Sequence, residues 1–279
     1  MPKTAGIDVS RWQREIDWER VAGAGYRFAV IRATIGNYYT DPRFYVNWRD
    51  ARDAGLLVSA YHVVTPDRPA DSQTERFFDV LDDRRCDFAP VLDAELTRGE
   101  SPEDITACLE ECGVSFEKAD GRKPVIYTAR WFWHRYVLDS LVCADFDLWV
   151  AHYGVSSPRV PRGWDEWSFW QYSDHGQVPG IHVATDLNWF NGSHEDLLAY
   201  VDGGETETEP PVAGLRARVS VEGVGVRSGP GLNYDHVGDL HEGDVVPVAS
   251  LAGNDIWIQI APERWAPFEA RGKRYMELE

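Results

Sequence analysis

Two carboxylates are spaced two residues apart in the apolar stretch FAPVLDAEL, residues 88–96. The stretch has the composition of a buried strand, in which side chains i and i+2 point to the same face. Asp93 and Glu95 are therefore expected to project together. A buried acid costs free energy unless something pairs with it, and packing alone gives no reason for two. Paired carboxylates can provide a protonated acid beside an ionised one, as glycoside cleavage requires.

Further polar residues lie at one end of other short apolar runs. In a barrel of alternating strands and helices the functional site forms at the carboxyl ends of the strands, so these side chains are predicted to converge. The acids among them are Asp8, in AGIDVS, and Asp186, in VATDLNWF. The candidate substrate-binding residues are Arg32, Tyr61, Tyr127, Trp149 and Gln171. Crowded carboxylates raise one another's pKa, because like charges held close together cannot all ionise.

These residues also have structural interpretations. Asp8 and Asp186 could cap the helix or turn that follows each of them, and Arg32 could neutralise buried carboxylates. His62 and His152 also lie at strand ends, but neither belongs to a motif with metal-ligand spacing. Both histidines are therefore expected to be structural, and no metal or other cofactor is predicted.

Eight short apolar runs precede residue 191, and amphipathic segments separate the earlier ones. The runs cover residues 5–10, 28–34, 56–64, 88–96, 124–128, 148–153, 167–173 and 183–190. Helices are expected at about 42–54, 71–84, 101–118 and 129–140, the third with Ser101 as N-cap and Pro102 in its first turn. Alternating strands and helices predict a parallel sheet, and eight strands predict a closed barrel. Because helical segments become rare after residue 140, we expect an irregular TIM-like (βα) barrel of the α/β class.

A second domain is predicted after the barrel. Residues 203–213 begin with Gly-Gly, alternate Glu with Thr and end with Pro-Pro, a composition typical of an extended linker. Residues 214–279 hold short Val-rich runs separated by Gly, Pro and Asn, without a helical pattern. We therefore expect a barrel over residues 1–202, a linker over 203–213 and a small all-β domain over 214–279.

The charge and the cysteines limit the partners and the compartment. The net charge of −18 disfavours nucleic acid and anionic membranes as partners. The amino-terminal MPKTAGIDVSRWQ lacks the apolar run of a signal peptide, and no stretch is apolar enough to span a membrane. The cysteines are Cys86, Cys108, Cys112 and Cys143. They lack metal-ligand spacing and are expected to be free, buried thiols of a protein made in a reducing cytoplasm.

Seven segments, taken in order, resemble the family 25 glycoside hydrolases, muramidases of the Chalaropsis type. They are AGIDVSRWQ, VIRATIGNYYTDPRFYVNWRDARDAGLLVSAYH, PVLDAEL, PVIYT, LWVAHY, WQYS and TDLNWF, between about residues 5 and 200. Arg32 departs from the Lys that the family commonly has, but it keeps the charge. The resemblance implies an irregular βα barrel that cleaves the β-1,4 bond between N-acetylmuramic acid and N-acetylglucosamine in bacterial peptidoglycan.

The resemblance also implies a role for each acid. Glu95 would protonate the leaving oxygen and then activate water. Asp93 would orient the substrate's acetamido group in a substrate-assisted reaction with retention, while a direct nucleophilic role for Asp93 and inversion through water stay open. Asp8 and Asp186 match two further acids of the family and are expected to tune pKa values and hold the substrate.

The segment VGVRSGPGLNYDHVGDLHEGDVVPV, followed by Trp257, resembles bacterial SH3-like wall-binding domains. The resemblance implies a module that tethers the enzyme to the cell wall and raises the local substrate concentration; the alternative is a stabilising appendage. A muramidase with such a module and no signal peptide is typical of a phage endolysin, made in the host cytoplasm and released through a membrane hole. A lysozyme secreted by a non-standard route is the alternative.

Two other functions would use the same residues differently. A metal-dependent peptidoglycan amidase or deacetylase would need histidines beside the acids. A wall-binding protein with a non-catalytic barrel would have no use for four convergent acids. In each case the expected partner is bacterial peptidoglycan, and the chain is expected to act as a monomer.

Overall fold

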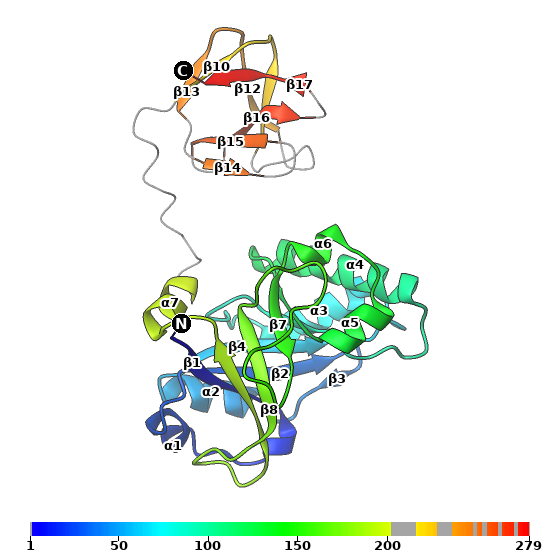
Figure 1. Cartoon of the computed structure of the whole chain (residues 1–279), viewed down its shortest axis with the longest axis vertical. Coiled ribbons are helices and arrows are strands. Elements are labelled where there is room, and N and C mark those ends of the chain that lie inside the picture. Colours follow the sequence, from blue (N-terminus) through cyan, green and yellow to red (C-terminus); the bar gives the residue numbers. More distant parts are fainter. Residues whose placement is uncertain are drawn as a thin grey trace. The chain divides into compact units, whose positions relative to one another are not determined.

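The computed structural model describes residues 2–201, 216–227, 236–247, 250–252, 256–261, 264–270 and 273–278. The chain divides into two compact units, Met1–Gly203 and Gly204–Glu279 (Figure 1). The predicted linker, 203–213, lies outside the described residues. So do residues 228–235 of the segment that resembles wall-binding domains.

Eight strands close into a barrel in the first unit (Figure 1). They are β1 (Thr4–Val9), β2 (Phe28–Ile35), β4 (Leu57–Val63), β5 (Val91–Asp93), β6 (Val125–Ala129), β7 (Asp147–Ala151), β8 (Phe169–Gly176) and β9 (Thr185–Phe190). The barrel closes because β1 pairs with both β2 and β9. A short strand, β3 (Tyr39–Thr40), pairs with the end of β2. The predicted eight-stranded barrel is therefore confirmed.

Two details of the predicted sheet are wrong. The last strand, β9, runs antiparallel to both β8 and β1, because the connection between Gly176 and Thr185 is shorter than the dozen or so residues that a parallel crossover needs. The strand that was expected to carry both Asp93 and Glu95 ends at Asp93. Glu95 therefore lies just beyond the strand.

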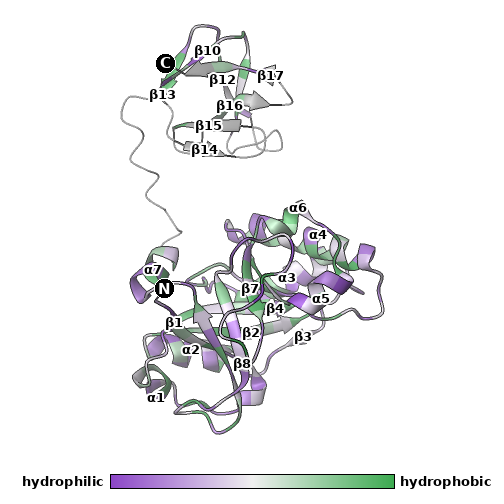
Figure 2. Ribbon diagram, in the orientation of Figure 1, coloured by the Kyte–Doolittle hydropathy of each residue, from purple (hydrophilic) through white to green (hydrophobic). Residues whose placement is uncertain are grey.

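Helices cover much of the outside of the barrel. They are α1 (Trp18–Gly23), α2 (Phe44–Asp53), α3 (Ala70–Leu81), α4 (Pro102–Asp120), α5 (Arg130–Tyr136), α6 (Leu141–Ala144), α7 (His194–Val201) and the 3₁₀ helix η1 (Arg11–Gln13). The four predicted helices correspond to α2, α3, α4 and α5, and Ser101 caps α4 as predicted. Helices such as α2 carry both hydrophilic and hydrophobic segments in Figure 2, as amphipathic helices do. None of the described helices is long and apolar enough to cross a membrane.

The interior of the barrel changes from apolar to polar along the strands. The rings of Phe28 and Phe169, from β2 and β8, meet at 5.4 Å inside the barrel. Gly6 leaves room for them, since a Cβ atom there would lie 2.3 Å from the ring of Phe28. Two residues after Phe169 the same face of β8 carries Gln171. The barrel is therefore packed at one end and polar at the other.

Aromatic side chains replace helices on the outside of the last strands. Residues 152–168 contain no helix. Trp164 and Trp167 from this connection pack instead around the buried Trp170 of β8. Trp18 of α1 and Trp48 of α2 are buried as well. Several tryptophans of this unit thus serve packing.

The second unit is all-β in its described part. Its strands are β10 (Arg216–Val219), β11 (Val224–Arg227), β12 (His236–Leu240), β13 (Val245–Pro247), β14 (Ser250–Ala252), β15 (Ile256–Ala261), β16 (Arg264–Ala270), β17 (Lys273–Arg274) and β18 (Met276–Leu278). They form two sheets, in the orders β13-β10-β18 and β12-β11-β16-β15-β14, with β17 beside β16. A small core includes Ala217, Val224 and Met276. The likeness to SH3-like domains stays a prediction.

The four cysteines, Cys86, Cys108, Cys112 and Cys143, are free and buried, as predicted. Burial raises the pKa of the Cys86 and Cys143 thiols to about 11. These two thiols are therefore neutral at physiological pH and have the character of small apolar side chains.

Candidate active site

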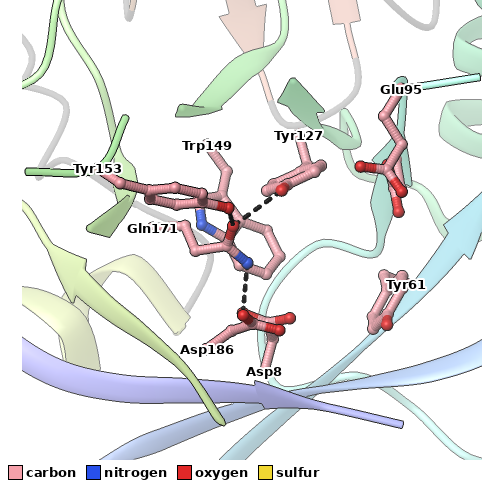
Figure 3. Close-up of a pocket in the computed structure, with 9 residues that line it drawn as sticks. Asp8, Tyr61, Glu95, Tyr127, Trp149, Tyr153, Gln171 and Asp186 are labelled. Atoms are coloured by element: carbon pink, nitrogen blue, oxygen red, sulfur yellow. Dashed lines mark hydrogen bonds between the residues drawn. The ribbon is translucent and has the colours of Figure 1, made fainter. Parts of the chain in front are cut away.

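A pocket of about 220 Å³ opens at the polar end of the barrel (Figure 3). The lining residues are Asp8, Tyr61, Asp93, Glu95, Tyr127, Trp149, Tyr153, Gln171 and Asp186. The pocket thus brings together all four predicted catalytic acids and four of the five predicted substrate-binding residues. Only Arg32 is not part of this lining.

Asp8 and Asp186 form a carboxyl pair. They face each other in the antiparallel ladder between β1 and β9. Burial raises the pKa of Asp186 to about 8, and the charges of Asp8 and Asp174 act in the same direction. Burial also raises the pKa of Asp8, while hydrogen bonds that it accepts oppose the shift. At neutral pH Asp186 therefore keeps its proton and donates it in a hydrogen bond to Asp8.

A network of hydrogen bonds holds the Asp8 carboxylate. Its Oδ2 accepts hydrogen bonds from Nε2 of Gln171 and Nδ2 of Asn188, each at 2.8 Å. Oε1 of Gln171 accepts in turn from the hydroxyl of Tyr127 at 2.8 Å, and also from the hydroxyl of Tyr153 (Figure 3). These bonds fix the orientation of the Gln171 amide. The polar lining is therefore a connected, preorganised unit.

Asp93 and Glu95 occupy another part of the pocket. Burial raises the pKa of Asp93 well above its ordinary value, with the charges of Glu95 and Asp8 adding to the shift. Oδ1 of Asp93 is buried and has no hydrogen-bond partner among the described residues. Glu95 is exposed at the mouth, and partial burial of its carboxyl and the charge of Asp8 raise its pKa. Figure 3 shows Glu95 across the pocket from Asp8 and Asp186.

Arg32 lies behind the pocket wall. Its Nη2 is 2.8 Å from Oδ2 of Asp41, a carboxylate that is 1% exposed. The positive charge of Arg32 nevertheless lowers the pKa of both Asp93 and Glu95 against the raising effect of burial. This placement agrees with the alternative in which Arg32 neutralises buried carboxylates.

The two histidines lie outside the pocket lining. His62 is fully buried, its Nδ1 lies 2.6 Å from the hydroxyl of Thr34, and burial lowers its pKa to about 4. Nδ1 of His152 accepts a hydrogen bond from the backbone N–H of Arg159 at 3.0 Å. Both histidines therefore have structural partners.

The site contains residues that the sequence analysis did not single out. Tyr153 lines the pocket, and Asn188 holds Asp8. Asn188 lies two residues after Asp186 on β9, and Tyr153 lies four residues after Trp149. The two-residue alternation along a strand could have indicated Asn188, whereas Tyr153 lies beyond the end of β7, where the alternation does not apply.

Comparison with known proteins identifies the family of the chain. The sequence model of glycosyl hydrolases family 25 matches residues 7–181. The chain belongs to this family. As a member of family 25 it is a glycoside hydrolase of the lysozyme and muramidase type.

Several family 25 proteins and related sequences are similar to the first unit. "Uncharacterized protein YegX" of Escherichia coli O157:H7 is 41% identical over 203 residues, which cover 71% of this chain and 73% of that protein. "Lysozyme M1" of Streptomyces globisporus is 36% identical over 206 residues, 70% of each chain. The crystal structure of the bacterial lysozyme from Streptomyces coelicolor is 35% identical, with a TM-score of 0.65, and covers 72% of this chain and 97% of that one.

Proposed function

We propose that this family 25 hydrolase is a muramidase that cleaves the β-1,4 bond between N-acetylmuramic acid and N-acetylglucosamine in bacterial peptidoglycan. The observation that carries the proposal is the meeting of four carboxylates in one pocket of a family 25 barrel. Mass spectrometry of digested peptidoglycan tests it. Fragments with a reducing N-acetylmuramic acid are expected, whereas separated peptides or deacetylated sugars would support an amidase or a deacetylase.

Glu95 is the proposed general acid and base. Partial burial and the charge of Asp8 raise the pKa of Glu95, which favours the protonated form that a general acid needs. The proton passes from Glu95 to the glycosidic oxygen as the bond to C1 breaks. Glu95 then accepts a proton from the water that attacks C1, which returns the carboxyl to its protonated state.

Asp93 is proposed to orient the acetamido group of the sugar. Its buried Oδ1 is without a partner among the described residues and can accept a hydrogen bond from a substrate N–H. When the acetamido oxygen attacks C1, positive charge develops on the acetamido group, and such a charge favours the ionised form of Asp93. The alternative is direct attack on C1 by Asp93.

The stereochemistry and an inhibitor separate these mechanisms. Proton NMR of the first product is expected to show retention at C1, and inversion would exclude both covalent routes. A thiazoline analogue of the cyclised acetamido sugar is expected to inhibit a substrate-assisted enzyme. Retention without inhibition by this analogue would support Asp93 as the nucleophile.

The other lining residues are proposed to hold the substrate. Tyr61, Tyr127 and Trp149 offer aromatic surface, while Gln171 and the Asp8–Asp186 pair offer polar atoms. Arg32 is proposed to act from behind the wall through its charge, in keeping with its ion pair to Asp41.

The second unit is proposed to be an SH3-like module that binds the cell wall. Its all-β architecture and the VRSGPG and GD segments support this role. The full chain is expected to sediment with purified walls, whereas residues 1–203, which have their own core, are expected to remain largely in solution. Equal turnover of soluble glycan fragments by the two proteins would show that the barrel is intact. Equal sedimentation would support a stabilising appendage instead.

The chain is further proposed to be a phage endolysin, made in the host cytoplasm and active on the wall after release. The pairing of a family 25 barrel with a second all-β unit supports this proposal. Bacteria that express the chain internally are expected to lyse only when a pore-forming protein is supplied. Appearance of the enzyme in the medium before permeabilisation would support secretion by a non-standard route.

A further inference from the structure

An exposed arginine and an exposed tryptophan follow the strand that carries the pocket residue Asp8. Arg11 and Trp12 belong to the 3₁₀ helix η1, which directly follows the strand that carries Asp8. Arg11 is exposed, and 63% of Trp12 is accessible to solvent. Arg11 lies three residues after Asp8, and three residues of extended chain span at most about 11 Å. One oligosaccharide in the pocket can therefore also contact Arg11.

The backbone of this segment is held in place. Oε1 of Gln13 accepts a hydrogen bond from the N–H of Ser10 at 2.8 Å, which completes a capping box. Nε2 of Gln13 donates to the carbonyl of Ala184 at 3.3 Å. The N–H of Arg11 donates to Oδ2 of Asp41 at 3.1 Å. The two exposed side chains thus project from a fixed base, which limits the entropy that a ligand must remove.

The guanidinium of Arg11 lies against aromatic rings. It is 4.5 Å from the ring centroid of Trp12 and 5.6 Å from that of Tyr39, distances at which a cation and a ring attract. No carboxylate of the described residues forms an ion pair with it, and the nearby Asp41 pairs with Arg32 at 2.8 Å. Arg11 therefore presents a positive charge that no acid of the described residues pairs with, in a chain of net charge −18.

We propose that Arg11 and Trp12 form a subsite that binds a carboxylate on a muramic acid residue of the glycan. This inference rests on the proposed function and adds to it a preference for carboxylate-bearing strands. The carboxylate belongs either to the lactyl group or to the peptide attached to it. The planar guanidinium matches a carboxylate with two parallel hydrogen bonds, and the exposed tryptophan offers a flat surface to a sugar ring. In a pocket with four acids, such a cation offsets the repulsion that a substrate carboxylate would otherwise meet.

Binding measurements on the full chain with Glu95→Gln, which keeps the substrate uncut, test the subsite. The ligands are a tetrasaccharide of alternating N-acetylglucosamine and N-acetylmuramic acid with free lactyl carboxylates, the same tetrasaccharide with these groups converted to amides, and a peptide-bearing tetrasaccharide. A charge-assisted pair is expected to make at least one carboxylate ligand bind about tenfold more tightly than the amide. Adding Arg11→Gln is expected to abolish this difference and to leave the affinity for the amide unchanged.

The matched control is Arg49→Gln. Arg49 lies on α2, is 67% exposed and pairs with Asp50, so its removal changes the net charge equally without touching the proposed subsite. This variant is expected to keep the tenfold difference. If only the peptide-bearing ligand binds more tightly than the amide, the carboxylate that Arg11 recognises belongs to the peptide. If the ligand with free lactyl groups also binds more tightly, the recognised carboxylate belongs to the sugar.

Other results would overturn the subsite. If Arg11→Gln lowers the affinity for the carboxylate and amide ligands equally, or lowers neither affinity, Arg11 does not recognise the charge. The subsite is also refuted if none of the ligands binds. The proposed function itself fails if the unaltered chain releases no fragments with a reducing N-acetylmuramic acid from peptidoglycan, so the two failures are distinguishable.

Discussion

Asp93 is the acid whose surroundings least permit a charge. It is 5% exposed, its Oδ1 is without a partner among the described residues, and three further acids line the same pocket. Burial and the charges of Glu95 and Asp8 favour the protonated form of Asp93, while the charge of Arg32 acts in the opposite direction. In the proposed reaction, the positive charge that develops on the acetamido group would favour the ionised form. The interaction of Asp93 with this charge is therefore expected to be stronger in the intermediate than in the bound substrate.

Glu95→Gln is expected to lower kcat/KM by a factor of about 10² to 10⁴, because the amide cannot transfer the proton. The measurement is the initial rate at which reducing ends appear from peptidoglycan. The control is Glu100→Gln, which makes the same change five residues later, outside the lining of the pocket. Similar rates for the two variants would contradict the role of Glu95.

Asp186→Asn is expected to flatten the dependence of stability on pH. The pKa of Asp186 rises from an ordinary 3.8 to about 8 on folding. Between these values the folded chain binds more protons than the unfolded chain, so this contribution to stability is complete below pH 3.8 and is lost as the pH rises to about 8.

Thermal unfolding midpoints across this pH range measure the effect. The midpoint of the unaltered chain is expected to fall more steeply with rising pH than that of Asp186→Asn. The other acids with raised pKa are present in both proteins, so the difference between the profiles reports Asp186 together with its effect on Asp8. Parallel profiles would mean that Asp186 is ionised in the folded protein throughout the range.

The strands were predictable from the sequence, but the direction of one strand was not. Short apolar runs indicate strands, and all eight lie where the runs predicted them. Asp186 was expected at the mouth because it lies in a strand, although it is the second residue of β9. It reaches the mouth because β9 is antiparallel, which reverses the end that faces the pocket. The short connection between β8 and β9 thus decides the direction of β9, which the pattern of apolar residues does not predict.

The missed helices and the early end of β5 have a common reason. The helices α1, α6 and α7 have six, four and eight residues, too few for a helical period to be visible. β5 has only three residues, although the backbone N–H of Ala94 still donates to the carbonyl of Tyr127 at 2.8 Å. The spacing of Asp93 and Glu95 therefore placed both acids at the pocket correctly, but the strand predicted to carry them was too long.

Gly6→Ala is expected to destabilise the barrel by about 1–3 kcal/mol, as overpacking of a core does. The new Cβ would lie 2.3 Å from the ring of Phe28, which is fully buried. Urea unfolding followed by tryptophan fluorescence measures the change. Gly23→Ala is the control, since nothing lies within 4 Å of its Cβ position. Adding Phe28→Leu is expected to recover part of the loss, and additive effects would contradict a direct clash.

The whole chain carries 46 acidic and 28 basic residues, a net charge of −18. Its proposed substrate is anionic as well, so approach to the wall meets long-range repulsion. Arg11 then acts only at short range, after encounter. The net negative charge of the chain therefore repels the anionic substrate at long range, whereas the positive charge of Arg11 is proposed to attract it at short range.

Activity on intact walls is expected to rise with moderate salt. The screening length falls to about 10 Å at 0.1 M, which removes the long-range repulsion while leaving contacts inside the pocket largely intact. Initial rates of turbidity loss over a range of salt concentrations provide the measurement. A steep fall that begins at the lowest salt concentration would show that attraction, and not repulsion, governs the encounter.

The pairing of Asp8 with Asp186 joins the first and the last strand of the barrel in one ladder. On a ribosome the first half of this pair emerges early, and the second emerges only after nearly the entire barrel has been synthesised. A nascent or truncated chain that ends before Thr185 has neither the closing strand nor its acid. We therefore expect such a chain to have no hydrolytic activity, so that the order of synthesis itself delays the appearance of the enzyme.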